Sequence, residues 1–428
     1  IVFPLLVLLG YLMRLNQAEK IHLGMDTFYT FMTLHGLGMA GLLFSTAFAA
    51  LWYLNGTRIV KLKTGIGYLV YFLVLLGVIG LAFATLFMKF GAGWYVLYPL
   101  PFKGTFWSSG ATSLVVASLI VLGIAWLIGI IHLVAALAKE FGGFSNLLGW
   151  QYLKKNNENK RELPPIAMIT TISLVPGVIA FLTGAIMLIM YLMQVFEPTL
   201  AFDPLLMKNM VMFFGHTLVN ITLYCCTGWV YALLPEFTGR PWKCDKIVVL
   251  SWNATFFFIV FAYFHHLYMD FAQPMILQYL GQIISYLSAV PATAVTLFGL
   301  IAQLYHSGIK WGPVPLSFLA GGAGWAIGGF AAVVDSTISV NTVLHNTTWV
   351  PGHFHTYMLM GVVFFIFGFL FYMSHTREEQ EKDLLAKIGI WVFAISGHSF
   401  LATFYRGGLR SIPRRYSDYA GIPNEYVH

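Results

Sequence analysis

Six histidines of this 428-residue sequence lie inside long apolar segments, where an unpaired imidazole is costly and commonly functional. They are His35, His216, His265, His266, His353 and His355. Imidazole nitrogens bind zinc, copper, iron and nickel. Because a single such histidine is more often a hydrogen-bonded core residue than a ligand, a metal site requires that several of the six meet.

Three of these histidines can share one ion. His265 and His266 are adjacent in the sequence, and with His216 they would supply three imidazoles. Three protein ligands leave a coordination position open, which is the arrangement of a reactive metal. Residue type alone does not distinguish copper from iron in such a pocket. No Asp or Glu lies well inside an apolar segment, Glu236 being the closest, which disfavours an iron site with carboxylate ligands.

The other three histidines suit larger cofactors. His353 and His355, in the stretch WVPGHFHTY, are two residues apart, which is about 200° around a helix, so their side chains point in opposite directions. They can serve two separate cofactors that flank one helix, and His35 is then an axial partner for one of them. Hemes fit because they take axial histidines and because their apolar rings suit a membrane interior.

The segments that must position these residues are membrane helices. The sequence is 58% hydrophobic and only 10% charged, with a mean hydropathy of +0.76. Stretches long enough to cross a lipid bilayer lie at 27–55, 65–88, 110–138, 166–195, 206–234, 245–269, 277–305, 313–334, 343–374 and 385–404. Residues 1–14 are expected to be part of a further helix that is truncated. Eleven helices would then be visible, out of about eleven or twelve in the fold. We predict an all-α polytopic membrane protein forming one transmembrane domain, 1–428.

The basic residues predict the orientation of these helices. Fifteen of the 24 Lys and Arg fall in loops on one side, which is expected to face the cytoplasm. They are Arg58, Lys61, Lys63, Lys139, Lys154, Lys155, Lys160, Arg161, Arg240, Lys243, Lys246, Lys310, Arg377, Lys382 and Lys387. In this orientation the six histidines share the outer leaflet. The net charge of +7 then reflects the excess of basic residues on the cytoplasmic side of the membrane. It does not indicate a nucleic-acid partner.

One arginine cluster lies on the opposite, outer side. The stretch RGGLRSIPRRY contains Arg406, Arg410, Arg414 and Arg415. On the sequence alone, lipid headgroups and the carboxylates of a buried cofactor explain such a cluster equally well.

These motifs together resemble a known family. The residues that carry the resemblance are TLHG around His35, GH at 215–216, HH at 265–266, YPLPFKG at 98–104, HNTTWVPGHFH at 345–355 and IPRRY at 412–416. The chain resembles the catalytic subunit I of the heme-copper oxidase superfamily, closest to its B family. The resemblance covers nearly the whole chain, and the interval between His216 and the adjacent pair also matches.

The resemblance implies a role for each motif residue. His35 and His355 would be the axial ligands of a low-spin heme, and His353 the single ligand of a high-spin heme. The copper facing that second heme would be held by His216, His265 and His266. Propionates of the hemes would meet His345, Asn346, Arg414 and Arg415.

The resemblance also implies partners and a location. The family pairs this subunit with a small cupredoxin-type subunit II, and electrons come from a cytochrome c, a cupredoxin or a quinol. The expected location is a prokaryotic cytoplasmic (inner) membrane, with multiple passes through the lipid bilayer. The cofactors would be two hemes and one copper ion.

Asn220 departs from the family pattern of oxygen-reducing members. In those members a tyrosine stands four residues after the first copper histidine and is joined to it covalently, whereas here this position is Asn220. Splitting O2 in one step takes four electrons, and one iron with one copper falls short of four without such a donor. Coupling two NO to N2O and water takes two. The sequence therefore predicts a nitric oxide reductase, in which Asn220 is either a hydrogen-bond donor to a bound N–O oxygen or an amide that packs between helices.

Two alternatives stay open at this point. The first is a terminal oxygen reductase that takes its missing electron from another residue, for example Tyr224 or Trp349. The second belongs to another class, a transporter or channel whose membrane histidines relay protons. A reduced-minus-oxidised heme spectrum separates the reductases from the transporter.

Overall fold

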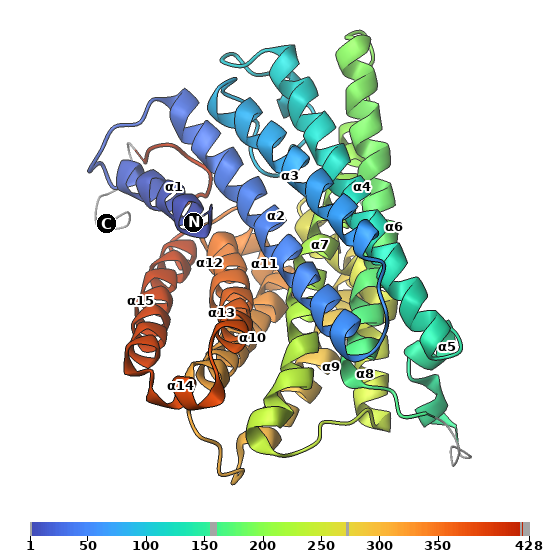
Figure 1. The fold of residues 1–428 in the computed structure, drawn as a ribbon. Helices are drawn as coiled ribbons and strands as arrows, with labels where there is room; N and C mark the ends of the chain where they lie inside the picture. Colours follow the sequence, from blue (N-terminus) through green and yellow to red (C-terminus); the bar gives the residue numbers. More distant parts are fainter. Residues whose placement is uncertain (1, 155–160, 271–273, 420–421, 423–428) are drawn as a thin grey trace.

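The computed structural model describes residues 2–154, 161–270, 274–419 and 422, and their regular structure is helical (Figure 1). Ten helices are long and apolar enough to cross a membrane. They are α2 Met25–Arg58, α3 Thr64–Leu86, α4 Ser109–Glu140, α6 Pro165–Phe196, α7 Pro204–Thr238, α8 with η3 Lys246–Leu267, α9 Met275–Leu304, α10 Pro313–Ser336, the compound helix Trp349–Ser374 and α15 Leu384–Leu409. The all-α prediction is confirmed.

Shorter helices lie between and before these. They are α1 Val2–Gln17, η1 Leu100–Phe102, α5 Phe144–Leu147, η2 Trp150–Leu153, α11 Ile338–Leu344 and α14 Arg377–Lys382. The compound helix consists of α12 Trp349–His355, the π-helical turn η4 Thr356–Val362 and α13 Val363–Ser374. Helix α8 itself is Lys246–Phe258, and η3, Ile259–Leu267, continues it.

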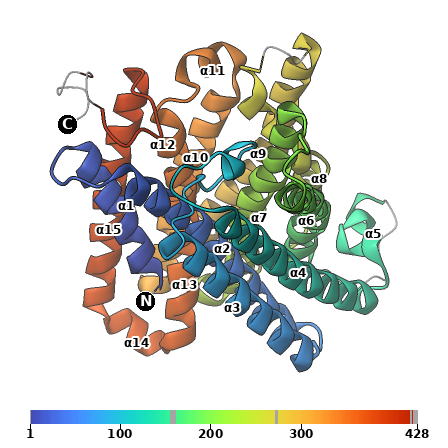
Figure 2. The same cartoon turned by 90° about the horizontal axis from the view of Figure 1, so that it is seen from above.

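Helix α7 occupies the middle of the bundle. It packs against α2, α6, α9, α10 and η3, an arrangement that is visible from above in Figure 2. In its most apolar stretch 83% of the residues are buried, against 11% in α15, which lies with α1 at one edge of the bundle. Polar side chains on α7 therefore face other helices and not lipid, so they need partners inside the protein.

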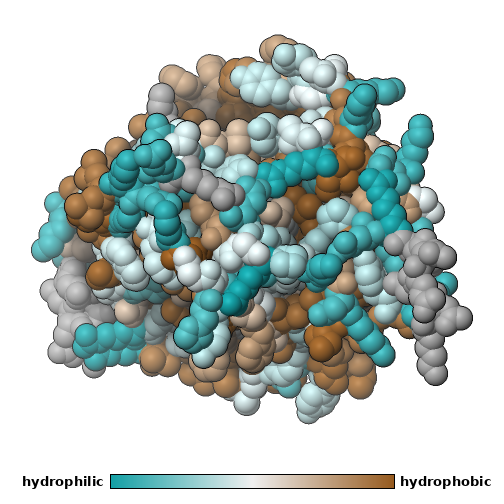
Figure 3. Space-filling view, turned by 60° about the horizontal axis from the view of Figure 1, so that its bottom comes forward, coloured by the Kyte–Doolittle hydropathy of each residue, from teal (hydrophilic) through white to brown (hydrophobic). Residues whose placement is uncertain are grey.

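Hydrophilic side chains gather at the lower end of the bundle in Figure 1, the end that holds α14 and the loops after α2 and α4. Figure 3 shows this end with hydrophilic residues spread over it and apolar surface around the flank. Ion pairs such as Lys310–Glu381 and Lys382–Glu378 lie here, fully within reach of water. An apolar flank with charged ends is the surface of a protein that crosses a bilayer.

Regular α-helical hydrogen bonding is interrupted at two places next to histidines. Residues 259–267, which include His265 and His266, form the 3-10 helix η3 where the sequence predicts one uninterrupted helix over 245–269. The segment expected as one helix over 343–374 is also interrupted: α11 ends at Leu344 and α12 begins at Trp349. Asn346 lies between them with φ +61, a left-handed conformation that a right-handed helix cannot include.

Candidate functional site

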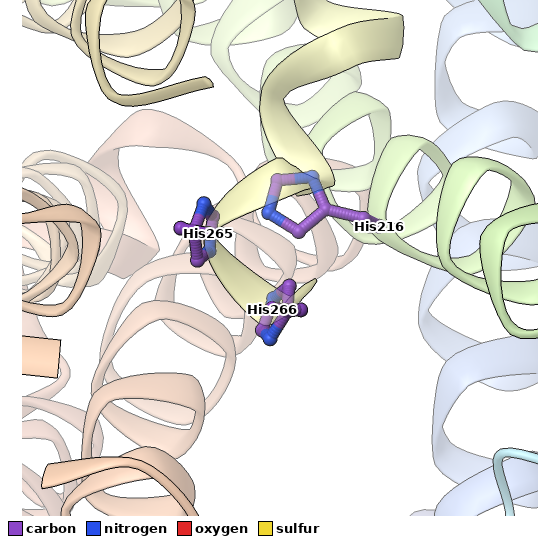
Figure 4. A group of neighbouring side chains, drawn as sticks. All are labelled: His216, His265 and His266. Atoms are coloured by element: carbon purple, nitrogen blue, oxygen red, sulfur yellow. The ribbon is translucent and has the colours of Figure 1, made fainter. Parts of the chain in front are cut away.

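Three histidines from two elements converge inside the bundle (Figure 4). His216 comes from α7, and His265 and His266 come from η3. One nitrogen from each lies within 4.8 Å of the others, and the ring centroids are 4.2 to 5.2 Å apart. Nitrogens bound to one ion at about 2.0–2.1 Å lie up to about 4 Å apart, so a small turn of the rings closes the site. Within the described residues this is the one such group of three or more.

The outer nitrogens of two of these rings are already occupied. His216 Nδ1 lies 3.1 Å from the Asn220 amide, and His265 Nδ1 lies 3.3 Å from Ser285 Oγ. The amide that the sequence assigned to a bound substrate is thus turned toward His216. Contacts of this kind fix the ring orientation and the tautomer of a metal-binding histidine. They leave Nε2 of both rings for an ion.

Asn220 must present its oxygen when His216 binds a metal. With an ion on Nε2, the proton of the neutral imidazole sits on Nδ1 and needs an acceptor. The amide oxygen and nitrogen of an asparagine are assigned from the hydrogen-bond network, so a half-turn of the Asn220 side chain supplies Oδ1 at the same place. Asn220 then holds His216 in the ligating tautomer.

His353 lies on the side of α12 that faces α10. Its Nδ1 donates to Gly328 O over 3.1 Å, and the ring is close enough to interact electrostatically with all three clustered histidines. A Cβ at Gly328 would approach the backbone of Tyr357 to 3.0 Å, so only glycine lets α10 lie this close to the chain that follows His353. The free Nε2 of His353 is the atom that a heme iron would take.

His355 lies on the opposite side of the same helix and faces His35 of α2. Their ring centroids are 6.2 Å apart and the rings are nearly parallel, at 18°. Two imidazoles bound through nitrogen at about 2 Å on opposite sides of one metal place their ring centres about 6 Å apart, so the pair fits an axial bis-histidine site. The sequence expectation that His353 and His355 serve different partners agrees with this placement.

Backbone carbonyls hold the rings of this pair. His355 Nδ1 donates to Pro351 O and His35 Nδ1 donates to Leu6 O, both over 2.7 Å. Leu6 belongs to α1, and this helix packs closely because Gly10 has no side chain: a Cβ there would lie 2.9 Å from the His35 ring. No sequence pattern indicates Leu6, because any residue type offers a backbone carbonyl.

Replacing Gly10 with valine is therefore expected to push α1 away from His35 and break its bond to Leu6 O. The imidazole then becomes a weaker donor of electron density, so the midpoint potential of a low-spin heme held by His35 would rise and its spectrum would broaden. A redox titration followed at the low-spin heme band measures this. Gly41→Val on α2 is the control, since a Cβ at Gly41 meets nothing within 4 Å. Equal potentials in both variants would contradict the role of α1.

The expected propionate residues gather at the outer end of α12. Arg414 Nη2 donates to Asn346 Oδ1 and Arg414 N donates to Asn346 O, both over 3.0 Å. The Arg415 guanidinium lies over the Tyr95 ring at 4.1 Å. Arg414 Nε and Trp349 Nε1 are buried donors without a hydrogen-bond partner among the residues that the structure describes. Such donors suit bound carboxylates, which heme propionates provide.

The charges of this region also favour an anion. Burial, with Arg415 nearby, lowers the pKa of Arg414 to about 9, so Arg414 is cationic at neutral pH. Burial and the Arg414 charge lower the pKa of His345 to about 4, so His345 is neutral there. Asp335, in the last turn of α10 and only 1% exposed, is one carboxyl that the sequence analysis missed. It lies near Arg414.

Comparisons with known proteins agree with this geometry. Residues 1–427 match the family described as "Cytochrome C and Quinol oxidase polypeptide I". The chain belongs to this family. Members of the heme-copper oxidase family are oxidoreductases that bind heme and copper in a membrane, and the three-histidine group is consistent with such cofactors. The transporter alternative is thereby set aside, and the chain is a multi-pass membrane protein.

Named relatives carry the same subunit description. Cytochrome c oxidase subunit 1 of Pecten maximus is 26% identical over 342 residues, which is 78% of this chain and 66% of the relative. The subunits 1 of Cereibacter sphaeroides and Thermus thermophilus are 27% and 24% identical, covering 52% and 53% of this chain. These two alignments span 39% and 43% of the relatives' own lengths.

One solved structure shares the fold. A heme-copper terminal oxidase dimer, determined by cryo-EM, superposes with a TM-score of 0.76 at 20% identity, covering 100% of this chain and 78% of that one. The helices that hold the six histidines therefore belong to a known architecture.

Proposed function

We propose that this chain is the catalytic subunit of a terminal oxidase that reduces O2 to water in a prokaryotic cytoplasmic membrane. The observation that carries the proposal is the group of His216, His265 and His266 beside His353, in a chain of this family. The relatives named above are cytochrome c oxidases, which favours O2 over the nitric oxide that the sequence predicts. A cupredoxin-type subunit II is the proposed partner, with cytochrome c, a cupredoxin or quinol as electron donor.

Each histidine has a defined task in this proposal. Two hemes and a copper ion, when bound, supply the redox chemistry. His35 and His355 hold the first heme, and their backbone partners keep both rings in one orientation. His353 holds the second heme, and because it shares α12 with His355, the electron path between the hemes is short.

A pair of buried tyrosines supports O2 as the substrate. The reaction needs one more electron donor than the metals provide, and Asn220 cannot be that donor. Tyr357, one helical turn after His353, has its ring 6.2 Å from the His353 ring, and it lies close enough to Tyr224 to interact with it electrostatically. Tyr224, the candidate named from the sequence, packs against Trp252 at 5.4 Å. An oxidisable phenol thus lies close to a heme ligand without occupying position 220.

Two observations favour a second candidate, the reduction of two NO to N2O. The first is Asn220 itself, which stands in the place of the cross-linked tyrosine. The second is proton supply along the buried face of α9, where Ser288 and Thr296 are separated by Ala292. The Ser288 hydroxyl donates to a backbone carbonyl, Ser285 O, and Thr296 bonds to Tyr231. An interrupted row of hydroxyls suits a reaction that consumes fewer protons from the cytoplasm.

Turnover with each gas decides between these candidates. The reduced, purified complex is supplied with O2 and, separately, with NO, and oxygen uptake and N2O formation are followed with the same electron donor. Rapid oxygen uptake with little N2O supports the oxidase. Rapid N2O formation with negligible oxygen uptake overturns it in favour of the nitric oxide reductase. Turnover of neither gas contradicts both.

Replacing Asn220 with leucine is expected to weaken copper binding by about 10- to 100-fold, because His216 Nδ1–H loses its acceptor. Asn220→Asp keeps an acceptor oxygen at the same place and is expected to retain copper. Copper content per heme after dialysis against a chelator measures both. Full copper retention in the leucine variant would show that Asn220 does not orient His216.

A further inference from the structure

Two consecutive residues of α7 are tied to the segment that carries His265 and His266. Lys208 Nζ lies 2.7 Å from both carboxylate oxygens of Asp270. The Tyr263 hydroxyl donates to Asn209 Oδ1 over 3.1 Å. Tyr263 precedes the adjacent histidines by two residues and Asp270 follows them by four, so the two bonds bracket the pair.

On α7, the two residues that make these bonds lie N-terminal to His216, the third histidine of the cluster. Lys208 precedes His216 by eight residues, which is about 12 Å along a helix. The bonds therefore join the helix of one ligand to the segment of the other two, on the outer side of the cluster. The hydrophobic contacts in the same region, such as Phe213 with Tyr263 at 5.9 Å, allow sliding, whereas the ion pair fixes two particular atoms.

The segment η3 needs such external support. It is nine residues of 3-10 helix, a form whose hydrogen bonds are poorer than those of an α-helix and which is uncommon beyond three or four residues. Helix α8 ends at Phe258, so a continuous α-helical ladder does not reach the two histidines. Metal ligands must be held to within about 0.5 Å, and a soft backbone alone does not ensure this.

This ion pair is more buried than the ion pair between Lys89 and Asp26. The Lys208 and Asp270 side chains are 23% and 24% exposed, whereas those of Lys89 and Asp26, also paired at 2.7 Å, are 46% and 39% exposed. Exposed pairs contribute little because water screens them. A lysine placed symmetrically on both carboxylate oxygens with less water nearby forms a stronger and more directional contact.

We propose that the Lys208–Asp270 ion pair sets the distance between His216 and the His265–His266 pair, and thereby the affinity of the three-histidine site for copper. The proposal rests on the proposed function only in naming copper as the ion. Lys208 and Asp270 are positioning residues, since neither belongs to the cluster itself.

The test measures copper affinity in the purified holoenzyme. Lys208→Met and Asp270→Asn each remove one charge with little change of shape, and each is expected to weaken copper binding about 10-fold. Cu(I) is titrated against a competing chelator, and the electron paramagnetic resonance of the oxidised copper reports the ligand geometry. Lys89→Met, which breaks the exposed pair, is the matched control and is expected to keep wild-type affinity.

Exchange of the two charges makes the test specific. The double variant Lys208→Asp with Asp270→Lys restores an ion pair, so it is expected to recover most of the affinity that each single variant loses. Normal heme spectra show that each variant is folded. Wild-type affinity in both single variants, or a double variant no better than the singles, overturns the ion pair's role. A wild-type protein that binds hemes but no copper contradicts the proposed function instead.

Discussion

Replacing His353 with alanine is expected to remove one of two hemes and to leave the other in place. His353 is the single candidate ligand on its side of α12, and its ring is held by Gly328 of α10. His355 points the other way, toward His35, and keeps its own bond to Pro351 O. The heme content should fall from two to one per chain, with carbon monoxide binding lost. Turnover should drop by more than about 100-fold, beyond the range of residues that only orient ligands.

A variant of His355 and a variant of a control histidine complete this experiment. His355→Ala is expected to lose the low-spin heme spectrum and to keep carbon monoxide binding. His398 of α15 is a matched control, because its Nδ1 also donates to a carbonyl four residues earlier, Ala394 O, over 2.8 Å. His398→Ala should keep both hemes. Loss of the same heme in the variants at 353 and 355 would mean that α12 serves one cofactor only.

Much of this arrangement follows from the sequence because membrane helices obey few rules. Apolar length gave ten spans, and each has a counterpart in the structure. Helical periodicity separated His353 from His355 by about 200°, and their contacts lie on opposite sides of α12. Two adjacent histidines and one distant histidine in the same leaflet were enough to predict a shared ion, since a bilayer leaves buried imidazoles few other partners.

Backbone geometry near the histidines was harder to predict. Hydropathy cannot distinguish an α-helix from the 3-10 helix η3, because both bury the same apolar residues. It also cannot locate the start of α12, which depends on the left-handed Asn346 and on the Thr348 N–H bond to Ile412 O. Contacts between residues far apart in sequence, such as Lys208 with Asp270, carry no local pattern at all.

The reacting gas was the property that was hardest to predict from the sequence. Asn220 is a single position, and its residue type alone favours nitric oxide. The named relatives favour O2, and the structure adds Tyr357, four residues after His353, which the sequence analysis did not single out. A missing residue changes the chemistry only if no other side chain can take its place, and that depends on packing between α7 and η4.

Alanine at His265 is expected to abolish copper binding while both hemes stay bound. The remaining His216 and His266 would give two imidazoles, and an ion with two protein ligands has lost the three-coordinate geometry that holds it. In the proposed assignment His35, His353 and His355 hold the hemes, and their ring nitrogens bond to backbone carbonyls and not to His265, so the heme spectra should be unchanged. Copper content should fall from one per chain to below about a tenth, and turnover by more than about 100-fold.

A histidine outside the cluster tests whether this loss is specific. His132 of α4 accepts a hydrogen bond from Lys63 N over 3.1 Å at the end of the bundle that holds the basic loops, and His132→Ala should keep copper and turnover. The serine partner gives a graded case: Ser285→Ala removes the contact to His265 Nδ1 but no ligand, so its effect should lie between those of the two alanine variants. Copper retained at full occupancy in His265→Ala would mean that the ion binds elsewhere. The order His265, then Ser285, then His132 in copper loss would tie the ion to the site formed by α7 and η3, because only ligands and their hydrogen-bond partners belong to it.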